Sequence, residues 1–496
     1  RTMLKGAAAA GLVSTVGCAT VPHPLLAAPR QIIQRENQLP GTPDWQLTFT
    51  KVDPATQYRC PWIEGYVSHA SIRAGETLDI MVSANPPGPF KIDLYRMGYY
   101  GGAGARQVAA LGPFQGETQP DPPIGPERVR ECQWIPCHSL RIPEDWVSGV
   151  YLGKLSLIND RWQSYIVFIV RDDRGADILF QCSDNTWQAY NRWPDHFALY
   201  DDGESGWALK PGIRVSYDRP YGKYCQILDA PLSQGSGEFL LWEFPLAYWL
   251  EHEGYDVTYC SNTDVHDNVQ CITRAKAMIS VGHDEYWSLE QYAHVKAAID
   301  AGVNVAFLSG NTCCFVAPLT PSAAGRPNRV LTRQGTYRAM SAKEAARMGP
   351  FPMYGPDEGL IIGARNIMPF NGSDDWIVSD DSAWIFEGTG MKNGDRIPGL
   401  VGWEFHGDPA DIPGLQVVAR GAARNTENEI GHWTATLYPG PKDNWVFNAS
   451  TIWWAQGLST PPGHMLPYSH YGRPHGPDPR VQRITRNVLE RFIAER

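Results

Sequence analysis

The sequence predicts a multidomain chain of β plus α/β type, because 496 residues are too many for one ordinary domain. Between residues 59 and 173, short apolar or alternating runs are separated by turn residues, which is typical of an immunoglobulin-like β-sandwich. From residue 174 to residue 496, strand-like runs alternate with runs of helical period, which is typical of a flavodoxin-like α/β domain. We expect an export signal over 1–30 and a linker or arm over 31–58 to precede these two domains.

The strands expected in the sandwich are short runs that end at glycine or at polar turn residues. They cover residues 64–68, 77–83, 91–96, 150–155 and 164–170. The proline-rich stretch 116–126 lies between the third and fourth of these runs and predicts an exposed loop.

The α/β domain is predicted from strands and helices that follow one another along the chain. The expected strands are 178–180, 256–260, 275–281, 303–308 and 444–449, and the expected helices are 238–252, 288–300 and 481–496. Ser288 is expected to cap the second helix, and Gly254 and Gly302 to end the first two. We expect a polar, aromatic turn over 184–191 and irregular structure over 320–430.

Charge argues against two classes of partner. The formal net charge is −10 and the isoelectric point is near 5.7. The sequence has no cluster of lysine and arginine, so neither nucleic acid nor an anionic membrane surface is an expected partner.

The first residues are typical of an export signal. Arg1 to Lys5 precede a short apolar stretch of small residues, as in a twin-arginine signal whose first arginine lies before the given start. The apolar stretch is too short for a good membrane-spanning helix. We therefore expect a periplasmic or secreted protein. The alternative is that Cys18 is lipidated, although the residues before it make a poor lipoprotein signal.

The ten cysteines fit an oxidising compartment. Cys132 with Cys137 and Cys260 with Cys271 are close enough in sequence to form disulfides. No Cys-x-x-Cys motif is present, which argues against a zinc ribbon. Motifs for nucleotide binding and for zinc proteases are also absent.

Polar clusters follow several of the expected strands, at 185–191, 242–243, 282–287, 309–314 and 402–406. The densest contains His283, Asp284, Glu285 and Tyr286, which are residue types that bind a metal or form an acid/base pair. The alternative is that these residues only tie down a loop and pack on the next helix. Cys313 follows a strand, as a nucleophile would, but the tight Gly-x-Cys-x-Gly turn is absent and a buried or disulfide-linked cysteine is favoured.

Seven segments, in order, resemble the large (beta) subunit of N,N-dimethylformamidase. They are TWQAYN (186–191), WEFPLAYWLEHEGYDVTY (242–259), SVGHDEYWS (280–288), GVNVAFLSGNT (302–312), GLVGWE (399–404), VFNASTIWWAQGL (446–458) and RITRNVLERF (483–492). The resemblance covers the chain from about residue 60 to its end.

This resemblance implies a β-sandwich followed by a glutamine-amidotransferase-like α/β domain. It also implies a mononuclear iron (Fe3+) that is held by two tyrosines and one glutamate, which are hard oxygen ligands. The expected ligands are Tyr151, Tyr190 and Glu243, which would meet at the junction of the two domains. Glu243 is flanked by Trp242 and Phe244, so burial without a partner would be costly.

An alternative ligand set keeps the loop of the densest cluster, with Tyr286 and either Glu285 or His283. Glu404 is the first candidate for a general-base carboxylate, and His283 and Asp284 are further candidates for catalysis.

The function expected from this resemblance is an exported, iron-dependent amidohydrolase that acts on a small or modified amide, at a C–N bond other than a peptide bond. The alternative is a non-catalytic or carbohydrate-binding exported protein that uses exposed tryptophan and tyrosine rings. A homo-oligomer and a small partner subunit both stay open.

Overall fold

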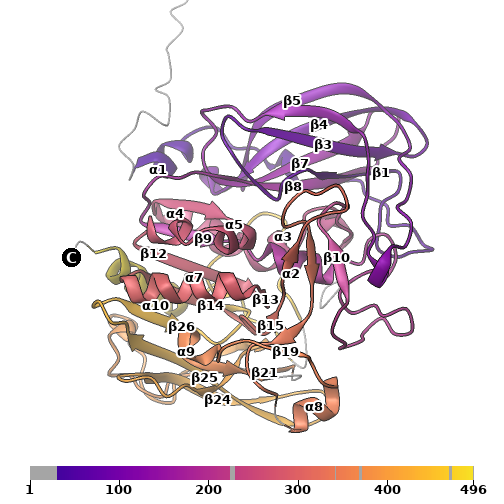
Figure 1. Cartoon of the computed structure of the whole chain (residues 1–496). Helices are drawn as coiled ribbons and strands as arrows, with labels where there is room; N and C mark the ends of the chain where they lie inside the picture. The colour runs from indigo at the N-terminus through magenta and orange to yellow at the C-terminus, as the bar shows by residue number, and fades with distance from the viewer. Residues whose placement is uncertain (1–30, 224–229, 341, 368–370, 469–471, 495–496) are drawn as a thin grey trace, which may run out of the picture.

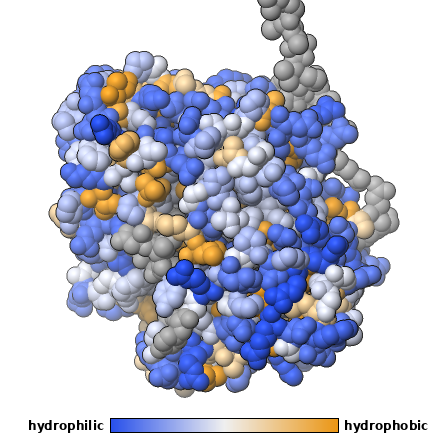
Figure 2. Space-filling model, turned by 180° about the vertical axis from the view of Figure 1, so that it is seen from behind, coloured by the Kyte–Doolittle hydropathy of each residue, from blue (hydrophilic) through white to orange (hydrophobic). Residues whose placement is uncertain are grey.

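The computed structural model describes residues 31–494 except 224–229, 341, 368–370 and 469–471. The molecule is multidomain and strand-rich, with several sheets and, in the described part, ten α-helices. The expected export signal and Cys18 lie outside the described residues. Among the helices that are described, none combines the length and apolar character needed to cross a bilayer. On the face shown in Figure 2, apolar residues lie in small separate groups among hydrophilic ones, as is usual for a protein surface.

The N-terminal part of the described chain forms two antiparallel-rich sheets, in the orders β1-β3-β6 and β2-β8-β7-β4-β5. Their strands are β1 (Ile63–Val67), β2 (Ser71–Arg73), β3 (Thr77–Ala84), β4 (Gly88–Met97), β5 (Ala105–Gly116), β6 (Pro136–Arg141), β7 (Gly149–Leu157) and β8 (Gln163–Arg171). Side chains from both sheets, such as Ile80, Leu94 and Phe168, share one apolar core. All five expected strands are present. The closer likeness to an immunoglobulin domain stays a prediction.

A nine-stranded sheet dominates the rest of the molecule, in the order β11-β9-β12-β14-β26-β25-β24-β21-β22. Its strands are β9 (Ile178–Gln181), β11 (Val257–Cys260), β12 (Ala277–His283), β14 (Asn304–Gly310), β21 (Gly372–Ile377), β22 (Arg396–Trp403), β24 (Gln416–Arg424), β25 (Ile430–Pro439) and β26 (Trp445–Asn448). The first five in the sheet order pair in parallel, as the alternation with helices predicts. The flavodoxin-like assignment of this part stays a prediction.

The other four strands extend the sheet in antiparallel fashion. Three of them, β21, β22 and β24, lie where we expected irregular structure, and β25 begins where that region ends. The register of β24 with β25 shifts between Val417 and Ala419, which interrupts the alternation of apolar and polar residues. Buried threonines such as Thr434 and Thr436 further weaken the apolar signal. Figure 1 shows these strands at the end of the molecule opposite the N-terminal sheets.

The helices begin and end where local chemistry predicts. The α7 helix (Leu289–Ala301) has Ser288 as its N-cap, whose side chain accepts from the Gln291 N–H, and Gly302 ends it in the left-handed conformation. The α10 helix (Pro479–Ile493) buries an apolar stripe that includes Val481, Ile484 and Val488. It starts at the Asp478 cap and packs on the large sheet.

Two local predictions need correction. Residues 184–191 form a helix, α2 (Asp184–Tyr190), and not a turn, because the helix is buried on every face and shows no amphipathic period. The expected helix over 238–252 is broken into α3 (Phe239–Trp242) and α4 (Phe244–Glu253). The break lies at Glu243, just before Pro245, which cannot donate a helical hydrogen bond.

The remaining α-helices and strands of the described chain are short. They are α1 (Ile32–Glu36), α5 (Asn262–Asp267), α6 (Gln270–Thr273), α8 (Ala342–Met348), α9 (Gly359–Ile362), β10 (Arg214–Ser216), β13 (Tyr286–Trp287), β15 (Phe315–Val316), β16 (Leu319–Thr320), β17 (Val330–Thr332), β18 (Gly335–Thr336), β19 (Met353–Tyr354), β20 (Ala364–Asn366) and β23 (His406–Pro409).

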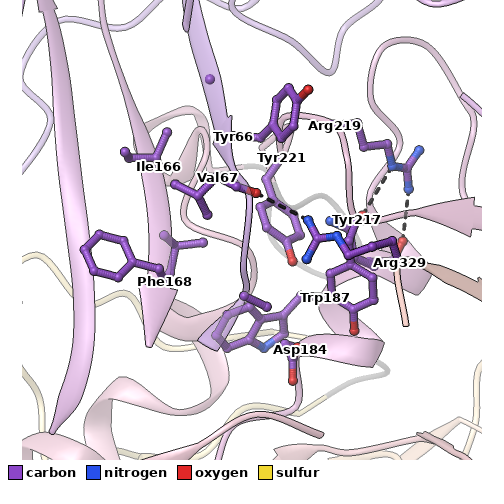
Figure 3. Close-up of a pocket in the computed structure, with 14 residues that line it drawn as sticks. Tyr66, Val67, Ile166, Phe168, Asp184, Trp187, Tyr217, Arg219, Tyr221 and Arg329 are labelled. Atoms are coloured by element: carbon purple, nitrogen blue, oxygen red, sulfur yellow. Dashed lines mark hydrogen bonds between the residues drawn. The ribbon is translucent and has the colours of Figure 1, made fainter. Parts of the chain in front are cut away.

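The seam between the N-terminal sheets and the large sheet is apolar and also carries charge. Leu152 and Val167 of the five-stranded sheet share a core with Phe180 and Leu250 of the α/β part. A small cavity of about 20 Å³ lies in the same seam, lined by β1, β8, α2 and the chain after β10 (Figure 3). This close packing holds the ends of the large sheet's strands in a defined place beneath the N-terminal part.

Candidate functional site

The candidate site lies at the carboxyl ends of two neighbouring parallel strands, which is the usual place for a site in an open α/β sheet. Residues His283 at the end of β12 and Gly310 at the end of β14 are paired in register. The chain after each strand therefore reaches the same edge, with Glu285 and Asn311 next in line. The end of β22 approaches from the antiparallel part and adds Glu404.

Glycine permits this close approach. A Cβ on Gly310 would lie 2.3 Å from the backbone oxygen of Glu404, and a Cβ on Gly282 would lie 2.5 Å from the Cβ of Trp242. Gly282 also has a φ of 64°, a conformation that L side chains rarely adopt. Both glycines thus allow the strand ends and α3 to come together around the site.

Three tyrosine hydroxyls and one carboxylate form a buried oxygen cluster. The Tyr190 hydroxyl donates to Glu285 Oε2 at 2.7 Å and lies 2.7 Å from the Tyr200 hydroxyl. The Tyr200 hydroxyl in turn lies 2.7 Å from the Tyr286 hydroxyl. Asn311 Nδ2 donates to the other carboxylate oxygen, Glu285 Oε1, at 3.0 Å.

A histidine joins this cluster to a second carboxylate. His283 Nε2 lies 3.2 Å from Glu285 Oε2 and 2.5 Å from Glu404 Oε2. One ligand atom of each of these three residues falls within 4.8 Å of the others, which is close enough for a shared metal ion. Burial disfavours the imidazolium, but the carboxylates of Glu404 and Glu285 outweigh it and raise the pKa of His283 well above its usual value.

The tyrosines respond to burial and to the same acid. Burial, and then the charge of Glu285, raise the pKa of Tyr190 well above its usual value. Burial and Glu285 also raise the pKa of Tyr200 and Tyr286, although the nearby Arg333 guanidinium opposes this at both phenols. The cluster is thus rich in acidic groups and short of cations.

A cavity of about 190 Å³ opens onto the cluster. Its polar lining comes from the site residues and Asn371, and the rest of its wall is largely apolar: Trp207, Leu209, Phe315, Met348, Ile367 and Trp403. This volume suits a small molecule with apolar substituents.

The structure gathers some of the predicted site residues and separates others. It brings Tyr190 together with Tyr286, Glu285, His283 and Glu404. The alternative ligand set and the Glu404 candidate are therefore neighbours of Tyr190 in one site.

Tyr151 and Glu243, predicted as ligands beside Tyr190, are held by other partners. Tyr151 stacks between Trp146 and Phe168 in the sandwich core, and its hydroxyl donates to the backbone oxygen of Val147 at 2.7 Å. The Glu243 carboxylate accepts from Trp187 Nε1 at 2.7 Å and from the Ser183 N–H at 3.1 Å. Both donors belong to α2 or to the residue before it. These hydrogen bonds offset part of the free-energy cost of burying Glu243, the cost from which a metal partner was predicted.

Asp284 also has its own partners. Its carboxylate accepts from Gln181, Asn262 and Ser280 at 2.6 to 2.9 Å, and it does not line the cavity. It therefore ties the strand ends together beneath the site, and the geometry favours Glu404 and His283 for proton transfer.

Sequence reasoning missed Tyr200 and assigned no role to Asn311. Tyr200 lies in an irregular stretch with no motif around it, so nothing local marks it. Asn311 follows a strand in one of the polar clusters, and its φ of 52° orients it toward Glu285.

Cys313 is fully buried in an apolar cluster, where burial raises its pKa well above its usual value, as expected for an inert thiol.

The family model described as N,N-dimethylformamidase beta subunit-like, C-terminal, matches residues 91–470. The chain belongs to this family. The match covers most of β4 and all of β5 to β8 in the N-terminal part, the large sheet and every residue of the cluster just described. Among curated proteins no match was found. Membership supports a dimethylformamidase-like protein of the hydrolase and amidohydrolase class.

Proposed function

We propose that this protein is an iron-dependent amidohydrolase for a small amide, with its centre at Tyr190, Tyr200 and Glu285. The observation that carries the proposal is the buried oxygen cluster at the strand ends, next to His283 and Glu404 and open to a small cavity. Family membership supports the same reaction class.

The residues present fit a ferric ion. The Tyr190 hydroxyl lies 2.7 Å from both the Tyr200 hydroxyl and the Glu285 carboxylate, and these phenol and carboxylate oxygens are hard donors of the kind that Fe3+ prefers. The cluster also holds two carboxylates, Glu285 and Glu404, against the single imidazole of His283. A bound cation would compensate this buried acid excess. Tyr286, whose hydroxyl is hydrogen-bonded to that of Tyr200, is the alternative phenol ligand of the proposed centre.

When bound, ferric iron supplies a Lewis acid toward the amide oxygen. The protein's own residues handle the protons. Glu404 is placed at the cavity wall to accept a proton from the attacking water, and His283 Nε2 holds that carboxylate at 2.5 Å. Water delivers OH to the carbonyl carbon, the C–N bond breaks, and the proton moves through this pair to the leaving amine nitrogen.

The apolar wall selects the substrate by size. A cavity of about 190 Å³ with Ile367, Met348 and Trp403 along it leaves room for a small amide and excludes a folded polypeptide.

Metal analysis with two glutamate variants tests the proposal. Wild-type protein is expected to carry near-stoichiometric iron with a visible tyrosinate-to-iron charge-transfer band. Glu285→Gln is expected to lose most of the iron and the band, because a cluster carboxylate is gone. Glu243→Gln is the matched control, since Glu243 is an equally buried acid with other partners, and it is expected to keep both. Folded, colourless wild-type protein that takes up no iron would overturn the proposal.

We further propose export and assembly. The signal-like residues 1–30 support a periplasmic or secreted location, which N-terminal sequencing of protein from that compartment would test.

The beta-subunit-like family supports a multi-subunit complex, with a small partner subunit or further copies of this chain. Native mass measurement of protein from its own source distinguishes these two assemblies.

A further inference from the structure

A fully buried arginine lies directly behind the site. Arg333 sits between β17 and β18, and its guanidinium donates to the backbone oxygens of Ala208 at 2.7 Å and Lys210 at 3.0 Å. Within the described residues it forms no ion pair with a carboxylate, and its Nη1 has no hydrogen-bond partner. A buried cation without an anion is costly, so this placement calls for an explanation.

Aromatic rings of the site surround this guanidinium. Its central carbon lies 4.7 Å from the ring centre of Tyr200 and 5.4 Å from that of Phe315. Phe315 in turn stacks on Tyr286, with ring centres 5.4 Å apart and planes within 17°. The Tyr200 and Tyr286 hydroxyls meet at 2.7 Å, which closes the group. Arg333 therefore faces the ring of Tyr200, whose hydroxyl belongs to the oxygen cluster, and reaches the Tyr286 ring through Phe315.

The same guanidinium holds the cavity wall. Its two acceptors, Ala208 and Lys210, flank Leu209 and follow Trp207, and both of these side chains line the cavity. One planar group thus bonds to the loop on one side and stacks on Tyr200 on the other, which a lysine ammonium does not reproduce.

We propose that Arg333 is a positioning residue that fixes Tyr200, and the wall beside it, for metal binding. Its charge lies against the acid-rich cluster, and its plane sets the orientation of the Tyr200 ring. The inference rests on the proposed function, because it assigns Arg333 a role toward the iron ligands.

Arg219 offers a matched control. It is also fully buried, and its guanidinium donates to the backbone oxygens of Ser216, Trp193, Phe197, Gln188 and Asn191. It lines the small seam cavity (Figure 3), and none of its described hydrogen bonds goes to the phenols of the oxygen cluster. Arg219→Lys and Arg333→Lys therefore make the same chemical change in two buried carbonyl cradles, only one of which stacks on a proposed ligand.

The test measures ferric-ion affinity by chelator competition, together with the charge-transfer band, in wild type, Arg333→Lys and Arg219→Lys. Arg333→Lys is expected to bind iron about 10- to 100-fold more weakly, with a shifted band, as for changes to groups that orient metal ligands. Arg219→Lys is expected to lose less affinity than Arg333→Lys and to keep the wild-type band, because Arg219 bonds to backbone oxygens on either side of Tyr190 and none of its described hydrogen bonds goes to a phenol of the oxygen cluster.

Each outcome has a definite meaning. Equal affinities of the folded Arg333→Lys and Arg219→Lys variants would overturn the role of Arg333 and leave the proposed function standing. Wild-type protein that takes up no iron would remove both. Should Arg333→Lys not fold, Phe315→Leu removes one ring from the guanidinium stack without changing charge, and unchanged affinity and band in that variant would also overturn the inference.

Discussion

Two buried clusters of charge in this molecule are built on opposite principles. At the seam, Arg96 pairs with Glu251 at 2.8 Å with both side chains fully buried, and Arg106 pairs with Glu36 at 2.7 Å. Two arginines there meet two glutamates. At the candidate site, Glu285 and Glu404 share one histidine and are surrounded by phenols.

The contrast separates a structural cluster from the proposed metal site. The seam pairs satisfy one another, and the hydroxyls of Tyr100 and Tyr259 supply further hydrogen bonds. The network therefore joins the arm, the N-terminal sheets and the α/β part without needing an external ion. The site concentrates acid at the edge of a cavity, with the His283 imidazole between the two carboxylates and the Arg333 guanidinium behind the Tyr200 ring. On the proposal above, a bound ferric ion would supply the remaining counter-charge.

The largest expected effect comes from breaking the seam pair. Arg96→Met leaves Glu251 as a buried charge without its cation, so we expect the free energy of unfolding to fall by about 3–5 kcal/mol. Chemical denaturation in the presence of a chelator measures this loss.

The double variant with Glu251→Leu is expected to recover part of the loss, since neither charge then remains. For metal-free Glu285→Gln we expect little change in stability. A loss equal to that of Arg96→Met would show that the site is a structural cluster of the same kind.

A second buried histidine sharpens the comparison through pH. His406 accepts from the Thr312 N–H at its Nε2, so its Nδ1 carries the proton toward Asn448 Oδ1 at 2.7 Å. Both partners are neutral, and burial lowers the pKa of His406 to about 4. The unfolded state then binds more protons between pH 6.5 and 4. We therefore expect His406 to lower the free energy of unfolding as pH falls through that window, by up to about 3 kcal/mol.

Denaturation of wild type and His406→Gln across pH 4 to 7 measures the effect. The glutamine is expected to flatten the dependence on pH, because it does not titrate there. An equally steep decline in both proteins would assign the acid sensitivity to other groups.

The smallest effect distinguishes a core tyrosine from a site tyrosine. Tyr151→Phe removes one hydrogen bond, to the Val147 oxygen, and should cost about 1 kcal/mol of stability with no change in iron content. Tyr190→Phe should lose iron instead, because its hydroxyl belongs to the oxygen cluster. Paired metal analysis and denaturation of the two variants decide this. If Tyr151→Phe loses iron and Tyr190→Phe keeps it, Tyr151 is an iron ligand as the sequence predicted, and the proposed centre is wrong.

Local pattern predicted much of the architecture. The Ser288 cap and Gly302 stop define α7, and the apolar stripe after Asp478 defines α10, because capping and amphipathic period act within a few residues. Apolar runs likewise located the parallel strands, and so placed His283 to Tyr286 at a strand end. The four antiparallel strands were missed because a register shift and buried threonines disturb the alternation.

The sequence by itself determined the family, the order of the parallel strands and the loop that carries His283 and Glu285. Only the tertiary structure decided which tyrosines and acids meet there. Tyr190 and Glu285 are 95 positions apart, and Glu404 lies farther along, directly after β22. Expected burial favoured Glu243 over Glu285 as a ligand, but the Glu243 carboxylate accepts from the Ser183 N–H and from Trp187, and the Tyr151 hydroxyl donates to a backbone oxygen. Packing across the sheet decides which side chains become hydrogen-bond partners. The periodicity of apolar residues along the chain therefore does not predict these partners.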